Sequence, residues 1–151
     1  GFESYEYFGY GPNESYIDKK RYTYVDDFTT TVTDNFEHYV RPQENSSHYG
    51  CKWAKVTNES GIGFICRAED FDSFSSNAQH FKPQMIREAK HDYELEPMKE
   101  TVLSIDYKMT GTGSGACGPD IDPKYSVNDK TFNFTFKILP TNTNGIDPFM
   151  V

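Results

Sequence analysis

The sequence predicts an all-β domain, and three observations favour this fold class. Aromatic residues make up 16% of the 151 residues, with 11 Tyr and 12 Phe, and such side chains suit a half-buried pleated surface. Several segments alternate apolar and polar residues with the period of two that is typical of strands. Glycines, 11 in all, supply turns between these segments. An antiparallel sandwich, with one buried and one solvated face per sheet, fits this pattern.

In the first half of the chain, the residue composition of three segments predicts strands. Residues 5–12 read as a strand that ends at a Gly-Pro turn, and residues 21–33 are rich in Thr, Tyr and Val, with a charged break at Asp26 and Asp27. Residues 35–40 ("NFEHYV") also have strand-like composition. These segments predict three strands ahead of a polar loop.

Residues 52–68 predict a hairpin with its turn at residues 58–61. Residues alternate along its second arm, so three apolar side chains are expected on one face: Ile62, Phe64 and Cys66. Trp53 on the first arm is interpreted as a core residue, with a sugar platform as its alternative.

One helix and two further strands are predicted beyond the hairpin. Residues 80–91 favour a helix, since Pro83 suits a first helical position. Residues 101–109 and 131–139 alternate as strands, and residues after Pro140 read as a tail. The side chains expected on one face of each strand are Leu103, Ile105 and Tyr107, and then Phe132, Phe134, Phe136 and Ile138.

Charge and cysteine usage limit the partners and the compartment. The formal net charge of −8 disfavours nucleic acid and anionic membranes, which need basic surface. The basic cluster 18–21 is interpreted as a solvated strand end, and no apolar run approaches the ~20 residues of a membrane span. Three scattered cysteines (Cys51, Cys66 and Cys117) predict reduced thiols in the cytoplasm. The strand-like start at Gly1 reads as a fragment of a longer chain.

No motif predicts chemistry of the chain's own. The four histidines lack zinc-site spacing, and the glycine-rich loop 111–119 lacks the Gly-Lys-Ser/Thr ending of a phosphate-binding loop. We therefore expect no metal and no cofactor. Two loops remain unusual in composition for simple turns, 41–50 ("RPQENSSHYG") and 111–119 ("GTGSGACGP").

These loops carry a resemblance to a known family. The segments "YFGYGPNESYIDKK" (7–20), "YVRPQENSSHYGCKW" (39–53) and "TVLSIDYKMTGTGSGACGP" (101–119) resemble the C-terminal, or small-chain, domain of glycoside hydrolase family 2 β-galactosidases. The resemblance covers residues 5 to 139. It implies an antiparallel β supersandwich, similar to the galactose mutarotase fold, of which residues 1–139 form the C-terminal half and 140–151 a tail.

The resemblance also implies a function and a partner. The family's two catalytic glutamates lie on a (β/α)8 barrel, which needs about 200 residues and cannot fit in this chain. The chain is then a non-catalytic part of an enzyme that hydrolyses terminal β-D-galactosides, and it is inactive alone. Its partners are the barrel domain and the galactoside.

Site residues follow from the two loops. The lac-type relative places a sugar-stacking tryptophan in the loop that matches 111–119, where this sequence has Cys117 followed by Gly118 and could offer backbone contacts instead. In loop 41–50, amide and imidazole groups suit a hydroxyl-rich ligand. The predicted sugar-contacting residues here are Asn45 and His48, and the predicted supporting residues are Arg41, Gln43 and Glu44. Alternatively, the loop forms a buried polar network in which Arg41 and Glu44 pair with each other or with nearby backbone.

Two other functions stay open on the sequence. A stand-alone carbohydrate-binding module would show exposed aromatic residues along one sheet face. An epimerase would need an acid and a base facing one pocket, for which Glu44 and His48 are the candidates. A sheet cut from a larger supersandwich would leave apolar surface uncovered, so the isolated chain is also expected to form a homodimer.

Overall fold

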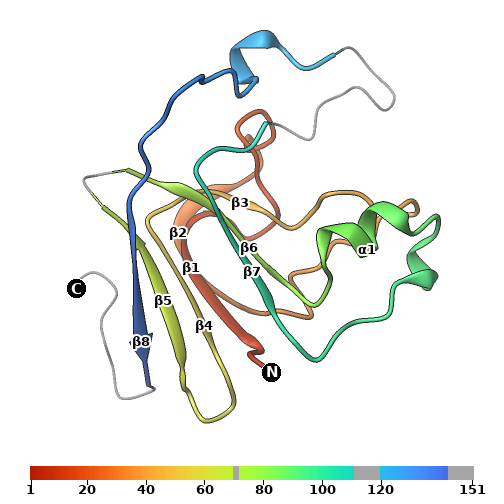
Figure 1. Cartoon of the computed structure of the whole chain (residues 1–151), viewed down its shortest axis with the longest axis vertical. Helices are drawn as coiled ribbons and strands as arrows, with labels where there is room; N and C mark the ends of the chain where they lie inside the picture. Colours follow the sequence, from red (N-terminus) through yellow and green to blue (C-terminus); the bar gives the residue numbers. More distant parts are fainter. Residues whose placement is uncertain (70–71, 111–119, 143–151) are drawn as a thin grey trace.

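A computed structural model describes residues 1–69, 72–110 and 120–142. It contains two antiparallel sheets, one of five strands in the order β2-β1-β4-β5-β8 and one of three strands in the order β3-β6-β7 (Figure 1). The predicted all-β class with antiparallel sheets is confirmed.

Eight strands and three short helical segments make up the described part of the chain. The strands are β1 (Ser4–Gly11), β2 (Tyr24–Thr31), β3 (His48–Cys51), β4 (Trp53–Thr57), β5 (Gly63–Ala68), β6 (Phe74–Gln79), β7 (Val102–Asp106) and β8 (Phe136–Thr141). The helix α1 spans Pro83–Glu88, and two 3-10 turns span Asp92–Glu94 and Pro123–Tyr125. No helix in these described ranges is long and apolar enough to cross a membrane.

The predicted hairpin is present as β4 and β5. The amide of Gly61 donates to the carbonyl of Asn58 at 2.8 Å, which closes the turn at the predicted residues. Gly61 has a φ of 72°, a left-handed conformation that glycine adopts without steric cost. The side chain of Asn58 accepts bonds from the amides of Ser60 and Ile62, so it stabilises the same turn.

The core lies between the two sheets. Tyr5 and Tyr7 of β1 point into it, and the hydroxyl of Tyr5 donates to the Ser76 hydroxyl of β6 at 2.9 Å, which joins the sheets. The remaining buried members of this core are Val32, Cys51, Ala54, Val56, Cys66, Ala68, Phe74 and Ala78. Cys51 and Cys66 are free thiols in it, and Trp53 is buried too.

On the second arm of the hairpin, Phe64 and Cys66 share one face of the sheet as predicted, but their exposure differs. Cys66 lies in the core, but Phe64 and Ile62 are exposed, and Ile65 on the opposite face is fully buried. Pairing places Phe64 opposite Pro140 and Cys66 opposite Ile138, so Phe64 and Ile138 share the core-facing side of the sheet. The three-stranded sheet therefore leaves part of this face, toward the edge strand β8, uncovered.

Three predicted elements need correction. Residues 35–40 form no strand: they follow a turn and are irregular, with Phe36 packed on Phe81 at 4.4 Å between ring centroids. The predicted charged break in residues 21–33 is absent, because β2 is an edge strand on which Asp26 and Asp27 are exposed. The helix expected over 80–91 has only the six residues of α1, and it does contain Pro83 in its first turn.

The last strand starts later and ends later than predicted. β8 begins at Phe136 and continues through Pro140, which an edge strand tolerates. Phe132 lies outside the strand and stacks on Tyr107 with centroids 4.6 Å apart. A division of the chain at residue 139 stays a prediction, since residues 143–151 lie outside the described ranges.

Candidate functional site

The predicted site residues of loop 41–50 divide into an enclosed set and an exposed set. Asn45 and His48 are each 1% exposed, whereas Arg41, Gln43 and Glu44 are exposed. Cys117 and Gly118 lie outside the described residues. The structure therefore encloses both Asn45 and His48 and leaves the predicted supporting residues on its surface.

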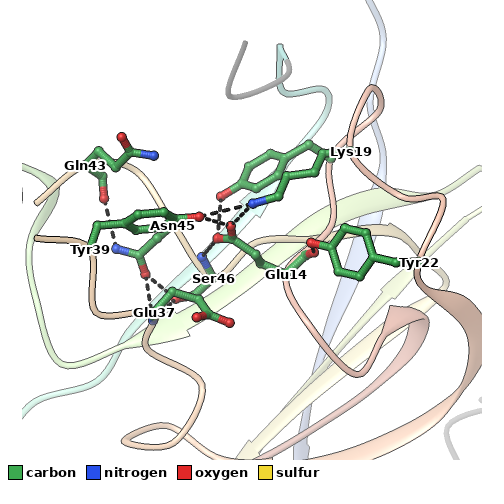
Figure 2. A network of polar contacts seen from close by, with 9 residues as sticks. Glu14, Lys19, Tyr22, Glu37, Tyr39, Gln43, Asn45 and Ser46 are labelled. Atoms are coloured by element: carbon green, nitrogen blue, oxygen red, sulfur yellow. Dashed lines mark hydrogen bonds and ion pairs between the residues drawn. The ribbon is translucent and has the colours of Figure 1, made fainter. Parts of the chain in front are cut away.

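A carboxylate outside the loop holds it in place. Glu14 follows β1 and is 4% exposed. Its carboxylate accepts bonds from the Lys19 ammonium at 2.5 Å, from the Tyr39 hydroxyl and from the Ser46 amide at 2.8 Å (Figure 2). Its backbone carbonyl accepts from the Tyr22 hydroxyl at 2.8 Å. Glu14 thus joins the segment after β1 to both sides of the loop.

The charges in this cluster compensate one another. Burial would raise the pKa of Glu14, but hydrogen bonds from Lys19, Tyr39 and the Ser46 amide outweigh it and lower the pKa. Burial would likewise lower the pKa of Lys19, and the bonds to Glu14 and Tyr39 raise it instead. Both groups are therefore charged at neutral pH, and they stabilise each other in a site partly removed from water.

Ser46 has a backbone conformation that side chains rarely adopt, with a φ of 66°. Its amide donates to Glu14, and its carbonyl accepts from the Asn35 side chain at 3.3 Å. Its hydroxyl accepts from the Glu37 amide at 3.0 Å and donates to the Asn45 side chain. These hydrogen bonds offset the backbone strain at Ser46 and fix the direction of the loop at this residue.

Both the side chain and the backbone carbonyl of Asn45 form hydrogen bonds within the chain. Its amide group donates to the carbonyl of Gln43 at 2.9 Å, and its side-chain oxygen accepts from the Glu37 amide at 3.3 Å. Its backbone carbonyl accepts from the Asn77 side chain of β6 at 2.8 Å. Asn45 therefore anchors the loop to the outer side of the three-stranded sheet.

His48 is a neutral, stacked core histidine. Its ring lies on Tyr7 with centroids 3.9 Å apart and planes at 22°. Burial lowers the pKa of His48 to about 4, although bonds to the carbonyls of Tyr10 and Asn13 oppose this shift. Nε2 lies 2.7 Å from the Asn35 side-chain oxygen and Nδ1 lies 3.3 Å from the Tyr10 carbonyl, and a neutral ring carries one proton, so it donates to only one of these two acceptors at a time; the shorter contact favours Nε2. The amide group of Asn35 also faces the carbonyl of Ala78, which fixes its orientation.

The exposed residues do not pair as expected. Within the described ranges, no ion pair joins Arg41 to Glu44. Partial burial, together with the negative charges of Asp106 and Glu14, raises the pKa of Glu44. Glu44 and His48 do not face one pocket either, because His48 is enclosed. Glu44 and His48 are therefore not placed as the facing acid and base that the epimerase alternative requires.

Sequence reasoning missed the central residue of this site. Glu14 lies in the segment 7–20 that carries the resemblance, but no sequence signal assigned it a role. Lys19 and Lys20 were expected to be solvated, yet Lys19 pairs with Glu14 and Lys20 lies 4.1 Å from the Tyr49 ring centroid. The one available signal was a lone acidic residue beside an isolated basic cluster, and it was too weak to use.

A cavity of about 340 Å³ lies beside the loop. Tyr49 of β3, Ser75 of β6, and Tyr107 and Met109 after β7 are among the residues that line it, and Tyr125 lines another side. The Ser47 hydroxyl contacts the Met109 sulfur at 3.3 Å, so the cavity adjoins the anchored loop. Among the described residues, no group of three or more His, Cys, Asp or Glu side chains could hold a metal ion.

The fold and this site define an antiparallel β-sandwich domain with a surface loop fixed by buried polar groups, next to a cavity rich in tyrosine. Comparison with known proteins gives the family. Residues 1–138 match the family described as beta galactosidase small chain, and the chain belongs to this family.

Its relatives include much longer enzymes. The chain is 40% identical over 134 residues to a beta-galactosidase of Actinobacillus pleuropneumoniae, covering 89% of this chain and 13% of the relative. It is 39% identical over 137 residues to a beta-galactosidase of Staphylococcus xylosus, covering 91% of this chain and 14% of the relative. A beta-galactosidase of Streptococcus thermophilus is 28% identical over 145 residues. The chain thus spans about one seventh of these relatives.

Proposed function

We propose that this chain is the non-catalytic C-terminal segment of a retaining, family 2 β-galactosidase, and that it completes the sugar pocket and stabilises the assembly. The observation that carries the proposal is the family match over residues 1–138, nearly all of this chain, and the alignments with its first relatives cover only 13–14% of their length. Nearly all the length of such an enzyme lies outside this segment.

Catalysis is assigned to the remaining part of the parent enzyme. Retaining glycosidases use two carboxyl groups about 5–5.5 Å apart, one as nucleophile and one as acid and base. Glu14, the most enclosed carboxylate of the loop site, is fully engaged with Lys19, Tyr39 and Ser46 and is unsuited to either role. The catalytic pair belongs to a barrel that this segment meets, and the parent hydrolyses terminal β-D-galactosides.

The contribution of this chain to sugar binding is indirect at the described residues. Asn45 and His48 are enclosed, so we propose that they serve the sugar pocket by fixing the loop. Cys117 and Gly118 stay the predicted residues of direct contact. The cavity beside the loop offers hydroxyl groups of serine and tyrosine, which can donate to and accept from a polyol.

A complementation assay tests the proposal. The purified chain is mixed with the matching upstream fragment of its parent, and hydrolysis of a chromogenic β-galactoside is followed. Activity in the mixture and in neither part is the expected result. Binding of the two parts with no gain of activity would show that the chain does not complete the catalytic site.

A stand-alone carbohydrate-binding module is the second candidate, and the tyrosine-rich cavity is the observation that favours it. In the described ranges, the exposed aromatic rings are spread over the start of β2 and the segment before it, β5, the 3-10 turn at Asp92–Glu94 and the segment before β8, which disfavours a platform along one sheet face. Galactoside binding by the isolated chain, followed by calorimetry, would favour this candidate if complementation fails. The supersandwich assignment and the cytoplasmic location stay predictions.

A further inference from the structure

The tip of the loop, residues 40–44, presents four exposed residues in the described structure. Val40 is 89% exposed, and Arg41, Gln43 and Glu44 are exposed as well, while Pro42 between them is buried. An aliphatic side chain, a guanidinium, an amide and a carboxylate therefore project together from five consecutive residues. Arginine is enriched at protein interfaces, where it combines bidentate hydrogen bonding with packing.

This tip is held at both of its ends. On one side the Tyr39 hydroxyl bonds to Glu14, and the Lys19 ammonium lies 3.1 Å from the same hydroxyl (Figure 2). On the other side Asn45 and Ser46 are fixed by the bonds to Glu14 and to the sheet. A solvent-exposed turn does not need such anchors. Anchoring of this kind lowers the entropy lost when a loop binds a partner.

The position of the tip indicates what it meets. The loop adjoins the tyrosine-rich cavity through the contact of Ser47 with Met109, and ligand pockets form preferentially where domains meet. Glu44 lies near the like charge of Asp106, so a cation from outside the chain would relieve repulsion. The exposed Arg41 would in turn pair with an external carboxylate.

We propose that residues 40–44, positioned by Glu14, form the surface by which this chain docks on the barrel-bearing part of its parent enzyme. In this arrangement Arg41 and Glu44 each meet an opposite charge and Val40 packs on an apolar patch. The occupant is that part of the parent, because the chain spans only 13–14% of its first relatives and the rest of such an enzyme has to contact it. This inference rests on the proposed function and names its interface.

The test measures binding and activity separately. The affinity of this chain for the upstream fragment is determined by sedimentation or calorimetry, and the recovered galactosidase activity is titrated in parallel. A chain carrying Val40→Ser with Arg41→Ala should bind at least about tenfold more weakly with an unchanged melting temperature, because hot-spot residues dominate interface affinity. Tyr93→Ser is the matched control, since Tyr93 is 82% exposed on another part of the surface, and it should bind like the unmodified chain.

A second pair of variants tests Glu14 as a positioning residue. Glu14→Gln keeps the shape of the side chain but removes the charge that holds Lys19, Tyr39 and Ser46. It is compared with Phe81→Leu, which loosens the small cluster around α1. At a temperature where both variants are folded, Glu14→Gln should weaken binding and Phe81→Leu should not.

The outcomes separate the two proposals. Unchanged affinity of the Val40 and Arg41 variant, with normal binding by the unmodified chain, would overturn the docking surface and leave the proposed function intact. Binding by the unmodified chain without activity, lost on substitution of the tip, would overturn the completing role and support the docking surface. Failure of the unmodified chain to bind would overturn both.

Discussion

The two ends of β1 lie in opposite kinds of environment. Beyond its last residue, polar groups are enclosed: Glu14, Ser46 and His48 are each at most 4% exposed. Beside its first residues, apolar groups are in contact with solvent: Phe64, which lies level with Tyr5 on the core-facing side of the sheet, is 43% exposed, and Ile62 at the hairpin turn is 57% exposed. A protein usually places these residue types the other way round.

The difference shows where the fold is complete and where it is open. The enclosed polar groups have partners within the chain, so their burial fixes a loop in one conformation instead of destabilising it. The exposed apolar groups extend the face that carries the core, but no strand of the three-stranded sheet covers them. At the first end the polar groups are enclosed by other described residues, and at the second end apolar side chains stay in contact with solvent.

The largest effect on stability is expected from removing the Glu14 carboxylate at the polar end. Glu14→Ala should lower the free energy of unfolding by about 3 kcal/mol, because removing one partner of a buried pair leaves charge and hydrogen-bond donors unsatisfied. The unpaired donors are the Ser46 amide and the Tyr39 hydroxyl. Urea denaturation measures the loss.

Glu14→Gln provides the comparison for this prediction, since the amide oxygen can still accept one of these bonds. It should lose clearly less stability than Glu14→Ala. Equal stability of the alanine variant and the unmodified chain would mean that the polar end is not held by Glu14.

The second prediction concerns acid. The pKa of His48 is about 4 in the folded chain and 6.5 as its ordinary value, so the folded state favours the neutral ring. Stability from this group is fully present above pH 6.5 and is lost as the pH falls to about 4, where the unfolded chain binds the proton first. The shift corresponds to a loss on the order of 3 kcal/mol, measured as the free energy of unfolding against pH.

His48→Gln isolates this contribution. Burial also raises the pKa values of Glu44 and Asp106, so protonation of these carboxyl groups adds stability as the pH falls and partly hides the histidine. The slope between pH 6.5 and 4 should differ between the two chains by the histidine contribution. Identical slopes would show that His48 is not enclosed as a neutral ring.

The two ends also differ in what the sequence could predict. The hairpin at the open end was predictable, because its turn depends on Asn58 and Gly61, whose conformational preferences are local. The sequence predicted that Phe64 and Cys66 share a face. It could not predict how exposed each side chain is, because exposure depends on which strands of the other sheet cover that residue. Ile65 was missed for the same reason: its face is covered by tertiary packing.

The polar end was harder to predict because its residues are distant in sequence. Glu14 and Ser46 are separated by 32 positions, and Asn45 and Asn77 also by 32. Loop 41–50 was recognised by its composition, but the sorting of its residues into enclosed and exposed sets depends on these long-range bonds. Residues 35–40 read as a strand because aromatic residues and valine favour strands locally, whereas Phe36 packs on Phe81 in an irregular segment.

A smaller effect is expected where one polar contact crosses the apolar core between the two sheets. Tyr5→Phe removes the hydroxyl that bonds to Ser76 and leaves the Ser76 hydroxyl unpaired, at a cost of about 1 kcal/mol. Adding Ser76→Ala should recover part of this loss, because replacing both partners is nearly neutral. A double-mutant cycle by urea denaturation gives the coupling, and additive effects would contradict a bond between the sheets.

The smallest effect on stability is expected at the open end, where the change appears in association instead. Ile62→Thr with Ile138→Thr should alter the free energy of unfolding by less than about 1 kcal/mol, because both side chains are exposed in the single chain. The same substitutions should abolish self-association of the isolated chain, which we expect to cover this apolar face with a second copy. Light scattering at high concentration measures the mass, and threonine keeps the branched side chain that suits β8 at Ile138. A monomeric unmodified chain would show that the exposed face is tolerated without a partner, and the contrast between the two ends would then concern packing alone.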